Sequence, residues 1–192
     1  MAVTAHAPMS VQAPSLYAGV LGSGWAELPS RIRRLHEEGT ATGRFTIRRG
    51  RGPLAALACW LCGFPAAGED VPTRLRVRQD GEVQRWERSF AGHPLVTLQR
   101  AWPGGLLGER LGPMECVFRL RAVAQGIAYE QVGTWLCLGS WRLPLPRLLA
   151  PRIEGLATEV PEGMRVHVKI GSAFTGWLLT YEGVVNPEGE AA

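Results

Sequence analysis

The chain lacks several features that define whole classes of protein. Its longest uncharged apolar run, Leu54–Cys62, has nine residues, whereas a helix that spans a bilayer needs about 20. The opening MAVTAHAPMS has neither the basic nor the apolar region of a secretory signal peptide. We therefore expect a soluble, cytoplasmic protein with no transmembrane segment.

Lysine is almost absent, because Lys169 is the only one and arginine supplies the other 20 of the 21 basic residues. Coding bias is one explanation of this excess of arginine, and selection for bidentate binding of carboxylate or phosphate is the alternative. The net charge is only +4, and the arginines are spread along the chain, whereas nucleic-acid binders concentrate charge on one face or arm. The composition therefore argues against nucleic acid as a partner.

Cysteine is also scarce, with four residues that include a C-x-x-C pair at Cys59 and Cys62. The pair lies inside an apolar run, where side chains three positions apart share one helical face. No second pair at metal-ligand spacing follows, and no nearby histidine completes a tetrahedral set. We expect these thiols to pack in the core, and we predict no metal site and no cofactor.

The patterning predicts one domain. Residues 1–14 are expected to form a flexible leader, residues 15–186 a single β-rich domain, and residues 187–192 a flexible tail. Spacings near 3.6 residues predict short helices at Ser15–Leu28, Pro29–Glu38 and Pro53–Leu61.

From Thr73 onward the period changes to two. TRLRVR, CVFRLRA and MRVHVKI each place apolar residues on one side and charged residues on the other, which is typical of half-buried antiparallel strands. Asp80-Gly81 predicts a two-residue hairpin turn. The fold class is therefore α+β and mainly β, with a strongly curved antiparallel sheet or barrel. We expect about eight or nine strands between Ala41 and Val185, closed so that no edge is exposed.

No recognisable catalytic motif is present. There is no G-x-S-x-G elbow, and the four histidines lie far apart in the sequence, so we interpret them as structural or solvent-facing. Polar and aromatic side chains instead share predicted strand faces, which suits a small-molecule pocket or an aromatic core. The three sets are Trp86, Arg88 and Phe90; Tyr129, Gln131 and Trp135; and Trp177, Leu179 and Tyr181.

Glu109 and Arg110 lie between an apolar pair and a Gly-Pro turn. Neighbouring strand residues point to opposite faces, so at most one of the two faces the interior. A buried charge must be paired, and Arg152 is the predicted partner for Glu109.

Five segments resemble a known family. LYAGVLGSGWAELPSRIRRLHE, AGEDVP, GGLLGERLGP, LPLPRLLAPRIE and GWLLTYEGVV, in this order from Leu16 to Val185, are similar to the bacterial domain of unknown function 4166 family. The resemblance implies that such domains occur alone or after an NAD-binding module like that of saccharopine dehydrogenases. It assigns no catalytic residues. Because this chain has no such module, a dehydrogenase activity would require a separate partner.

Three functional hypotheses follow. The first is a small-molecule-binding domain with an apolar pocket for a hydrophobic or amphipathic ligand, acidic ligands included. The second is a cofactor-independent cyclase or isomerase that uses the same pocket. The third is an accessory domain that docks on a saccharopine-dehydrogenase-like partner. The predicted ligand-binding residues are Trp86, Arg88, Arg110, Gln131, Trp135, Arg152 and Trp177, and the acid/base candidates are Glu109, Tyr129 and Tyr181.

Overall fold

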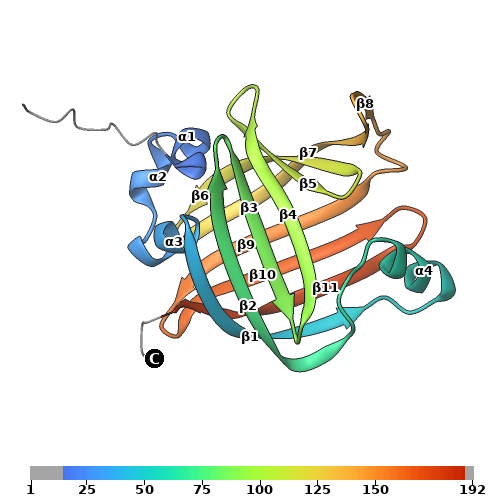
Figure 1. Cartoon of the computed structure of the whole chain (residues 1–192), viewed down its shortest axis with the longest axis horizontal. Helices are drawn as coiled ribbons and strands as arrows, with labels where there is room; N and C mark the ends of the chain where they lie inside the picture. The colour runs from blue at the N-terminus through green and yellow to red at the C-terminus, as the bar shows by residue number, and fades with distance from the viewer. Residues whose placement is uncertain (1–14, 189–192) are drawn as a thin grey trace, which may run out of the picture.

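The protein forms a β-barrel with short helices at both ends (Figure 1). The computed structural model describes residues 15–188, so the predicted leader and residues 189–192 of the predicted tail lie outside the described residues. The helices are α1 Leu16–Leu21, α2 Gly24–Glu27, α3 Ser30–Leu35 and α4 Pro53–Leu61. The strands are β1 Gly39–Arg49, β2 Gly68–Asp80, β3 Val83–Phe90, β4 His93–Trp102, β5 Leu106–Leu111, β6 Met114–Val123, β7 Gly126–Leu138, β8 Trp141–Pro144, β9 Pro151–Val160, β10 Gly163–Ser172 and β11 Gly176–Pro187.

Antiparallel pairing closes the sheet. Each of β1 to β6 pairs with the next strand in the chain. The ring is then completed by the pairs β7–β9, β9–β10, β10–β11 and β11–β1. Ten strands therefore form the closed barrel, and β8 pairs with β7 outside it. The mainly β, closed antiparallel fold is confirmed, but the predicted strand number of eight or nine is too low. The strands β5 and β8 are short, and β8 is exposed at every residue, so neither carries a recognisable alternation.

The alternating segments place their apolar residues inside the barrel, as the period of two predicts. In β10, Val166, Val168 and Ile170 line the interior, while Arg165 and Lys169 are exposed. The first hairpin of the barrel wall is also present, although its two loop residues are Gly81 and Glu82, because Asp80 still pairs with Val83. In this turn Gly81 has the left-handed backbone conformation (φ 58°), which glycine adopts without strain because it has no Cβ atom.

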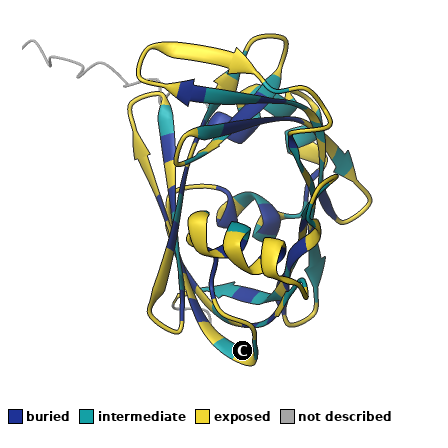
Figure 2. Cartoon of the chain, turned by 90° about the vertical axis from the view of Figure 1, so that its right-hand side faces the viewer, coloured by how far each residue is buried: buried dark blue, intermediate teal, exposed yellow. Residues whose placement is uncertain are grey.

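Helices α1, α2 and α3 cover one end of the barrel, and α4 lies at the other end (Figures 1 and 2). The predicted first helix divides into α1 and α2 at Gly22, which has φ 56° and therefore ends α1 as glycine commonly does. In α4, Ala55 and Cys59 are buried, and the Cys59 Sγ contacts the Leu178 carbonyl oxygen at 3.5 Å. Cys62 is only half-buried. None of the helices in residues 15–188 is long and apolar enough to cross a membrane.

Closure at the β7–β9 seam depends on Gly126, since a Cβ atom there would lie 1.8 Å from the Ala157 carbonyl oxygen. We expect Gly126→Ala to lower the free energy of unfolding by about 2 kcal/mol or more, because backbone must move to admit the methyl group. Gly19→Ala is the matched control, because Gly19 is exposed in α1 and nothing lies within 4 Å of its added Cβ. This control should stabilise by about 0.5–1 kcal/mol. Urea denaturation measures both, and equal effects of the two substitutions would contradict the role of the seam.

Candidate functional site

The barrel interior contains a cavity of about 140 Å³. Most of its wall is apolar, and Arg88 and Glu109 are the only Arg, Lys, Asp or Glu residues among the described side chains that line it. The polar and titratable lining residues are His36, Thr73, Arg88, Thr97, Gln99, Glu109, Cys116, Tyr129 and Tyr181. Such a wall, mainly apolar with a few converging polar groups, is typical of small-molecule sites.

Arg88 on β3 and Glu109 on β5 form the ion pair of the cavity, with 3.5 Å between an Arg88 guanidinium nitrogen and Glu109 Oε1. Arg88 also donates a 2.9 Å hydrogen bond to the Thr97 hydroxyl and lies 5.2 Å from the Trp86 ring centroid. Burial alone would lower the pKa of Arg88, but Tyr181 and Glu109 outweigh it and the net shift is upward. The guanidinium is therefore charged and fixed in place.

The predicted pairing of Glu109 with Arg152 is wrong. Arg152 is exposed near the start of β9, whereas Glu109 faces the interior from β5, where Arg88 reaches it from β3. Arg110 is exposed and donates to the Gly112 carbonyl. The expectation that only one of the two neighbouring charges faces inward is therefore confirmed, and that one is Glu109.

A chain of hydrogen bonds joins the helical end of the barrel to the cavity. The Tyr17 hydroxyl of α1 donates to Gln99 Oε1 at 2.8 Å and lies 2.9 Å from the Tyr129 hydroxyl. The Tyr129 hydroxyl lies 3.2 Å from His36 Nε2, and His36 Nδ1 lies 2.7 Å from the Ile32 carbonyl oxygen. Since a carbonyl only accepts, Nδ1 carries the proton and Nε2 is free to accept from Tyr129.

Burial keeps this chain neutral. It lowers the pKa of His36 to about 4, and it raises the pKa values of Tyr17 and Tyr129 above their ordinary range. An imidazole and two phenols without charge therefore occupy one end of the site at neutral pH. The hydrogen bonds from Tyr17 to Gln99 and from Tyr129 to His36 satisfy polar groups that burial would otherwise penalise.

Tyr181 on β11 differs from the other two tyrosines. Its ring packs between Phe45 and Phe90, with centroids 6.1 and 5.6 Å away, and only 7% of the residue is exposed. Among residues 15–188 its hydroxyl has no hydrogen-bond partner, although it lines the cavity beside the charges of Arg88 and Glu109. Burial raises its pKa, so the hydroxyl holds a proton that it can donate.

The acid/base candidates Glu109, Tyr129 and Tyr181 all line the cavity, and so do Trp86 and Arg88. Gln131 does not line it, because its amide is held by the Pro151 carbonyl and the Ile153 amide. The other predicted ligand-binding residues that lie outside the cavity lining are Arg110, Trp135, Arg152 and Trp177.

Two bulges explain the directions of Trp135 and Trp177, which the alternating pattern places on the faces of Tyr129 and Tyr181. The register of β7 skips Val132, and that of β11 skips Leu178. One extra residue reverses the facing of everything beyond it. Trp135 therefore packs 5.0 Å from the Trp102 ring, and Trp177 donates to the Thr180 hydroxyl on the surface.

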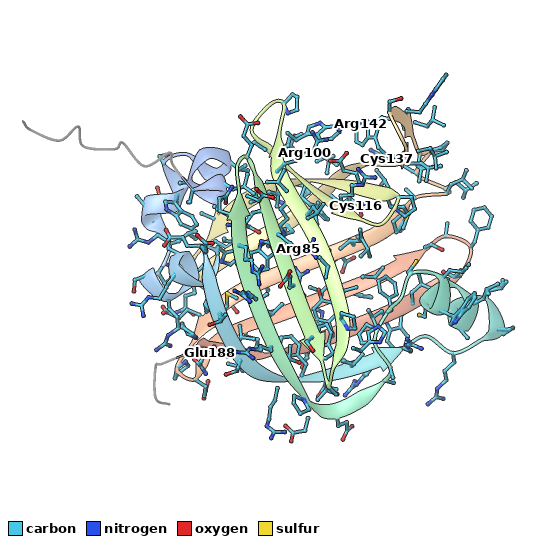
Figure 3. The ribbon with its side chains drawn as sticks, viewed as in Figure 1. Arg85, Arg100, Cys116, Cys137, Arg142 and Glu188 are labelled. Atoms are coloured by element: carbon cyan, nitrogen blue, oxygen red, sulfur yellow. The ribbon has the colours of Figure 1, made fainter. Side chains whose placement is uncertain are left out.

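Trp135 belongs to a second polar cluster, outside the barrel wall and close to β8. Arg100 Nε donates to the buried Glu115 at 2.7 Å, and the guanidinium groups of Arg100 and Arg142 lie 4.9 and 5.7 Å from the Trp102 ring. Figure 3 places Arg100, Arg142 and Cys137 together in this region. The cluster consists of the Arg100–Glu115 ion pair, two indole rings inclined at 48° and two guanidinium groups over Trp102, so we interpret it as structural.

The sequence analysis missed three residues of the site, Tyr17, His36 and Gln99. Gln99 follows Leu95 and Thr97 at spacings of two in β4, so the alternation in LVTLQR contained the signal. Tyr17 and His36 approach from helices that are distant in the chain, and no local pattern indicates their contact with the sheet. Within residues 15–188 no three His, Cys, Asp or Glu side chains converge as a metal site would require.

Fold and site together define a closed antiparallel β-barrel with an internal, mainly apolar cavity. The chain belongs to the family described as Domain of unknown function (DUF4166), which matches residues 28–185. The family resemblance found in the sequence is therefore confirmed. No curated protein and no solved structure matches the chain.

Proposed function

We propose that this domain binds a small apolar or amphipathic molecule inside the barrel, with an oxygen-bearing end at Tyr181 and Arg88. The observation that carries the proposal is the Tyr181 hydroxyl, which faces the cavity without a hydrogen-bond partner among the described residues. The hydroxyl is open to the cavity rather than sealed in the wall, since it is not one of the fully buried polar atoms that lack a partner. A ligand oxygen that enters the cavity can therefore accept a hydrogen bond from it.

The volume of the cavity limits the ligand. At about 140 Å³ it is close to the roughly 150 Å³ of an engineered apolar cavity that binds benzene. The proposed ligand is therefore about the size of one ring or a short chain. A larger molecule would require movement of the wall or of the helices at the ends.

The ion pair bears on the charge of the ligand. Arg88 and Glu109 neutralise each other, so an anionic ligand would add an uncompensated charge to a buried site. The site therefore favours a neutral carbonyl or hydroxyl oxygen, such as that of phenol or cyclohexanone. An acidic head, as the sequence suggested, would have to compete with Glu109 for Arg88, and benzoate is the matched acid that tests this version.

Tyr181→Phe is the sharpest variant for this proposal. We expect it to leave the free energy of unfolding close to that of wild type, because the hydroxyl makes no hydrogen bond to the described residues. It should weaken phenol binding by about 2- to 12-fold, the equivalent of one hydrogen bond. Titration followed by NMR measures affinity, and urea denaturation measures stability.

Tyr17→Phe is the control, because its hydroxyl contacts both Gln99 and Tyr129. This substitution should destabilise the protein by about 1–2 kcal/mol. Wild-type protein at a ligand concentration tenfold above the dissociation constant should gain about 1.4 kcal/mol, or roughly 3–6 °C in melting temperature. If phenol, cyclohexanone and benzoate all leave the spectrum of the barrel interior unchanged, the proposal is wrong.

A cofactor-independent isomerase or cyclase is the second candidate, because Glu109, Tyr129 and Tyr181 line the same cavity. In this version Glu109 removes a proton next to a carbonyl that Tyr181 polarises. The test is loss of the α-proton signals of cyclohexanone in D₂O, which Glu109→Gln should abolish. The accessory role beside an NAD-binding partner rests on the family resemblance alone, and co-purification with such a protein would support it.

A further inference from the structure

Exposed apolar side chains gather at one end of the molecule. Of the fifteen large hydrophobic residues that are exposed in residues 15–188, eleven belong to three segments, 48–64, 138–152 and 170–177. We call these eleven the apolar rim: Leu54, Leu57, Trp60, Leu61, Leu138, Trp141, Leu143, Leu148, Leu149, Phe174 and Trp177. Monomeric proteins rarely leave so much apolar surface together without a use for it.

The strand register brings these segments to the same end. Arg49, at the end of β1, pairs with Leu179 in β11, so α4 begins beside the β10–β11 turn. Ser172 pairs with Pro151, which places that turn beside the segment that follows β8. In Figure 1 the three segments lie along the right-hand side, and in Figure 2 this side faces the viewer, with α4 in the centre.

The charge on the three rim segments has one sign. The three segments contain no aspartate or glutamate, and five of their arginines are exposed: Arg48, Arg51, Arg142, Arg147 and Arg152. At the opposite end, the β2–β3 and β9–β10 turns carry the acidic residues Glu82 and Glu162. Glu69 and Asp70 lie at the start of β2, and Asp70 is neutralised by Arg44 at 2.6 Å. The three rim segments therefore carry a net positive charge.

We infer that the apolar rim docks on the surface of a membrane rich in anionic lipid. Tryptophan and leucine side chains that project from separate turns can enter the interface one by one, while the arginines between them contact lipid phosphates. The leading residue is Trp60, which is 74% exposed at the end of α4. A flat protein partner would have to match three protruding segments at once, whereas a fluid lipid surface adapts to them. The charge also complements anionic lipid.

This inference goes beyond the proposed function and does not depend on it, because the rim lies outside the cavity. It gives the molecule an orientation, with the α4 end against the membrane and α1, α2 and α3 away from it. Binding should be reversible and sensitive to salt, since both the apolar contacts and the arginine contacts are exposed.

The test is co-sedimentation of the full chain with phosphatidylcholine vesicles, with or without about one-third phosphatidylglycerol. We expect at least about tenfold tighter binding to the anionic vesicles. The double variant Trp60→Ser/Leu61→Ser should lose about tenfold or more, and Arg51→Gln/Arg147→Gln should lose a similar factor on anionic vesicles only. Leu98→Ser and Arg165→Gln are controls, because both residues are exposed outside the rim segments and outside the cavity lining, and each should stay within about twofold of wild type.

Failure of the wild-type chain to bind anionic vesicles would overturn the inference. Rim variants that bind as tightly as wild type, or controls that lose as much as rim variants, would overturn it as well. If light scattering instead finds a dimer that Trp60→Ser/Leu61→Ser dissociates, and vesicles are not bound, the rim is an interface between copies of the chain. Phenol binding is measured without vesicles, so failure of one proposal is distinguishable from failure of the other.

Discussion

Arg88→Met is expected to lower the free energy of unfolding by about 3 kcal/mol, which is a large share of the stability of a domain this size. The variant leaves the Glu109 carboxylate in an apolar cavity without its cation, 3.5 Å from where the guanidinium was. It also removes the hydrogen bond to Thr97 and the contact with Trp86. The two side chains are only 16% and 20% exposed, so solvent compensates little of the loss. Urea denaturation at pH 7 gives the value directly.

The double variant Arg88→Met/Glu109→Met separates the charge effect from the loss of packing. Replacing both members of a buried ion pair by apolar side chains is often neutral or stabilising. We therefore expect the double variant to recover most of the stability lost in Arg88→Met. A double variant as unstable as the single one would mean that Arg88 acts through Thr97 and Trp86, and that the pair with Glu109 contributes little.

Acidification is expected to remove about 3 kcal/mol of stability through His36 alone. Burial lowers the pKa of His36 from 6.5 in the unfolded chain to about 4 in the folded protein. Between these values the unfolded state binds the proton and the folded state does not, so stability falls as the pH falls. The effect is absent above pH 6.5 and complete near pH 4, and the gap between the two pKa values sets its size.

His36→Phe isolates this effect from the carboxylates that titrate in the same range. The variant keeps an aromatic ring beside Tyr17 and Trp86, whose centroids lie 4.6 and 5.5 Å from His36. It should be less stable than wild type at pH 7, because Tyr129 loses a partner. From pH 7 to pH 4 the stability of the variant relative to wild type should rise by about 3 kcal/mol, so that the order of the two proteins reverses. A constant difference across that range would mean that the pKa of His36 is the same in the folded and the unfolded protein.

The sequence predicted the barrel because alternation is a local property. The alternation in TRLRVR and MRVHVKI indicates which face of each strand is buried. Closure of the sheet is then expected because it leaves no exposed edge strand. The same logic selected Trp86, Arg88, Tyr129 and Tyr181, all of which line the cavity. In each of their strands, no bulge lies between the residue and the alternating apolar residues that pack in the core. For Glu109 and Arg110 the same logic required only that at most one of the two face inward.

The errors arise where the period breaks. The extra residues Val132 and Leu178 reverse the facing of Trp135 and Trp177, and nothing in the local sequence distinguishes a bulge from a regular strand. The partner of Glu109 was also missed, because Arg88 is 21 positions away in sequence and reaches it across β4. Contacts of this kind depend on strand order and tilt, which no single segment encodes.

The polar chain from Gln99 to His36 has the same origin. It joins α1, β4, β7 and the end of α3, and the contact between Tyr17 and Tyr129 spans 112 positions. The side chains of a helix that covers one end of a barrel contact the strands at that end. Their partners therefore cannot be inferred until it is known which end the helix covers. His36 is therefore one of the residues on which the site depends, although no local pattern distinguishes it.

A crystal exposed to xenon under pressure tests the central claim most directly, because xenon enters vacant apolar cavities. We predict one strong xenon peak inside the barrel, in contact with Tyr181, Phe45 and Phe90. Co-crystals with phenol should place the ring at the same position, with its oxygen toward the Tyr181 hydroxyl. A barrel interior filled by its own side chains, with no xenon between them, would contradict the account.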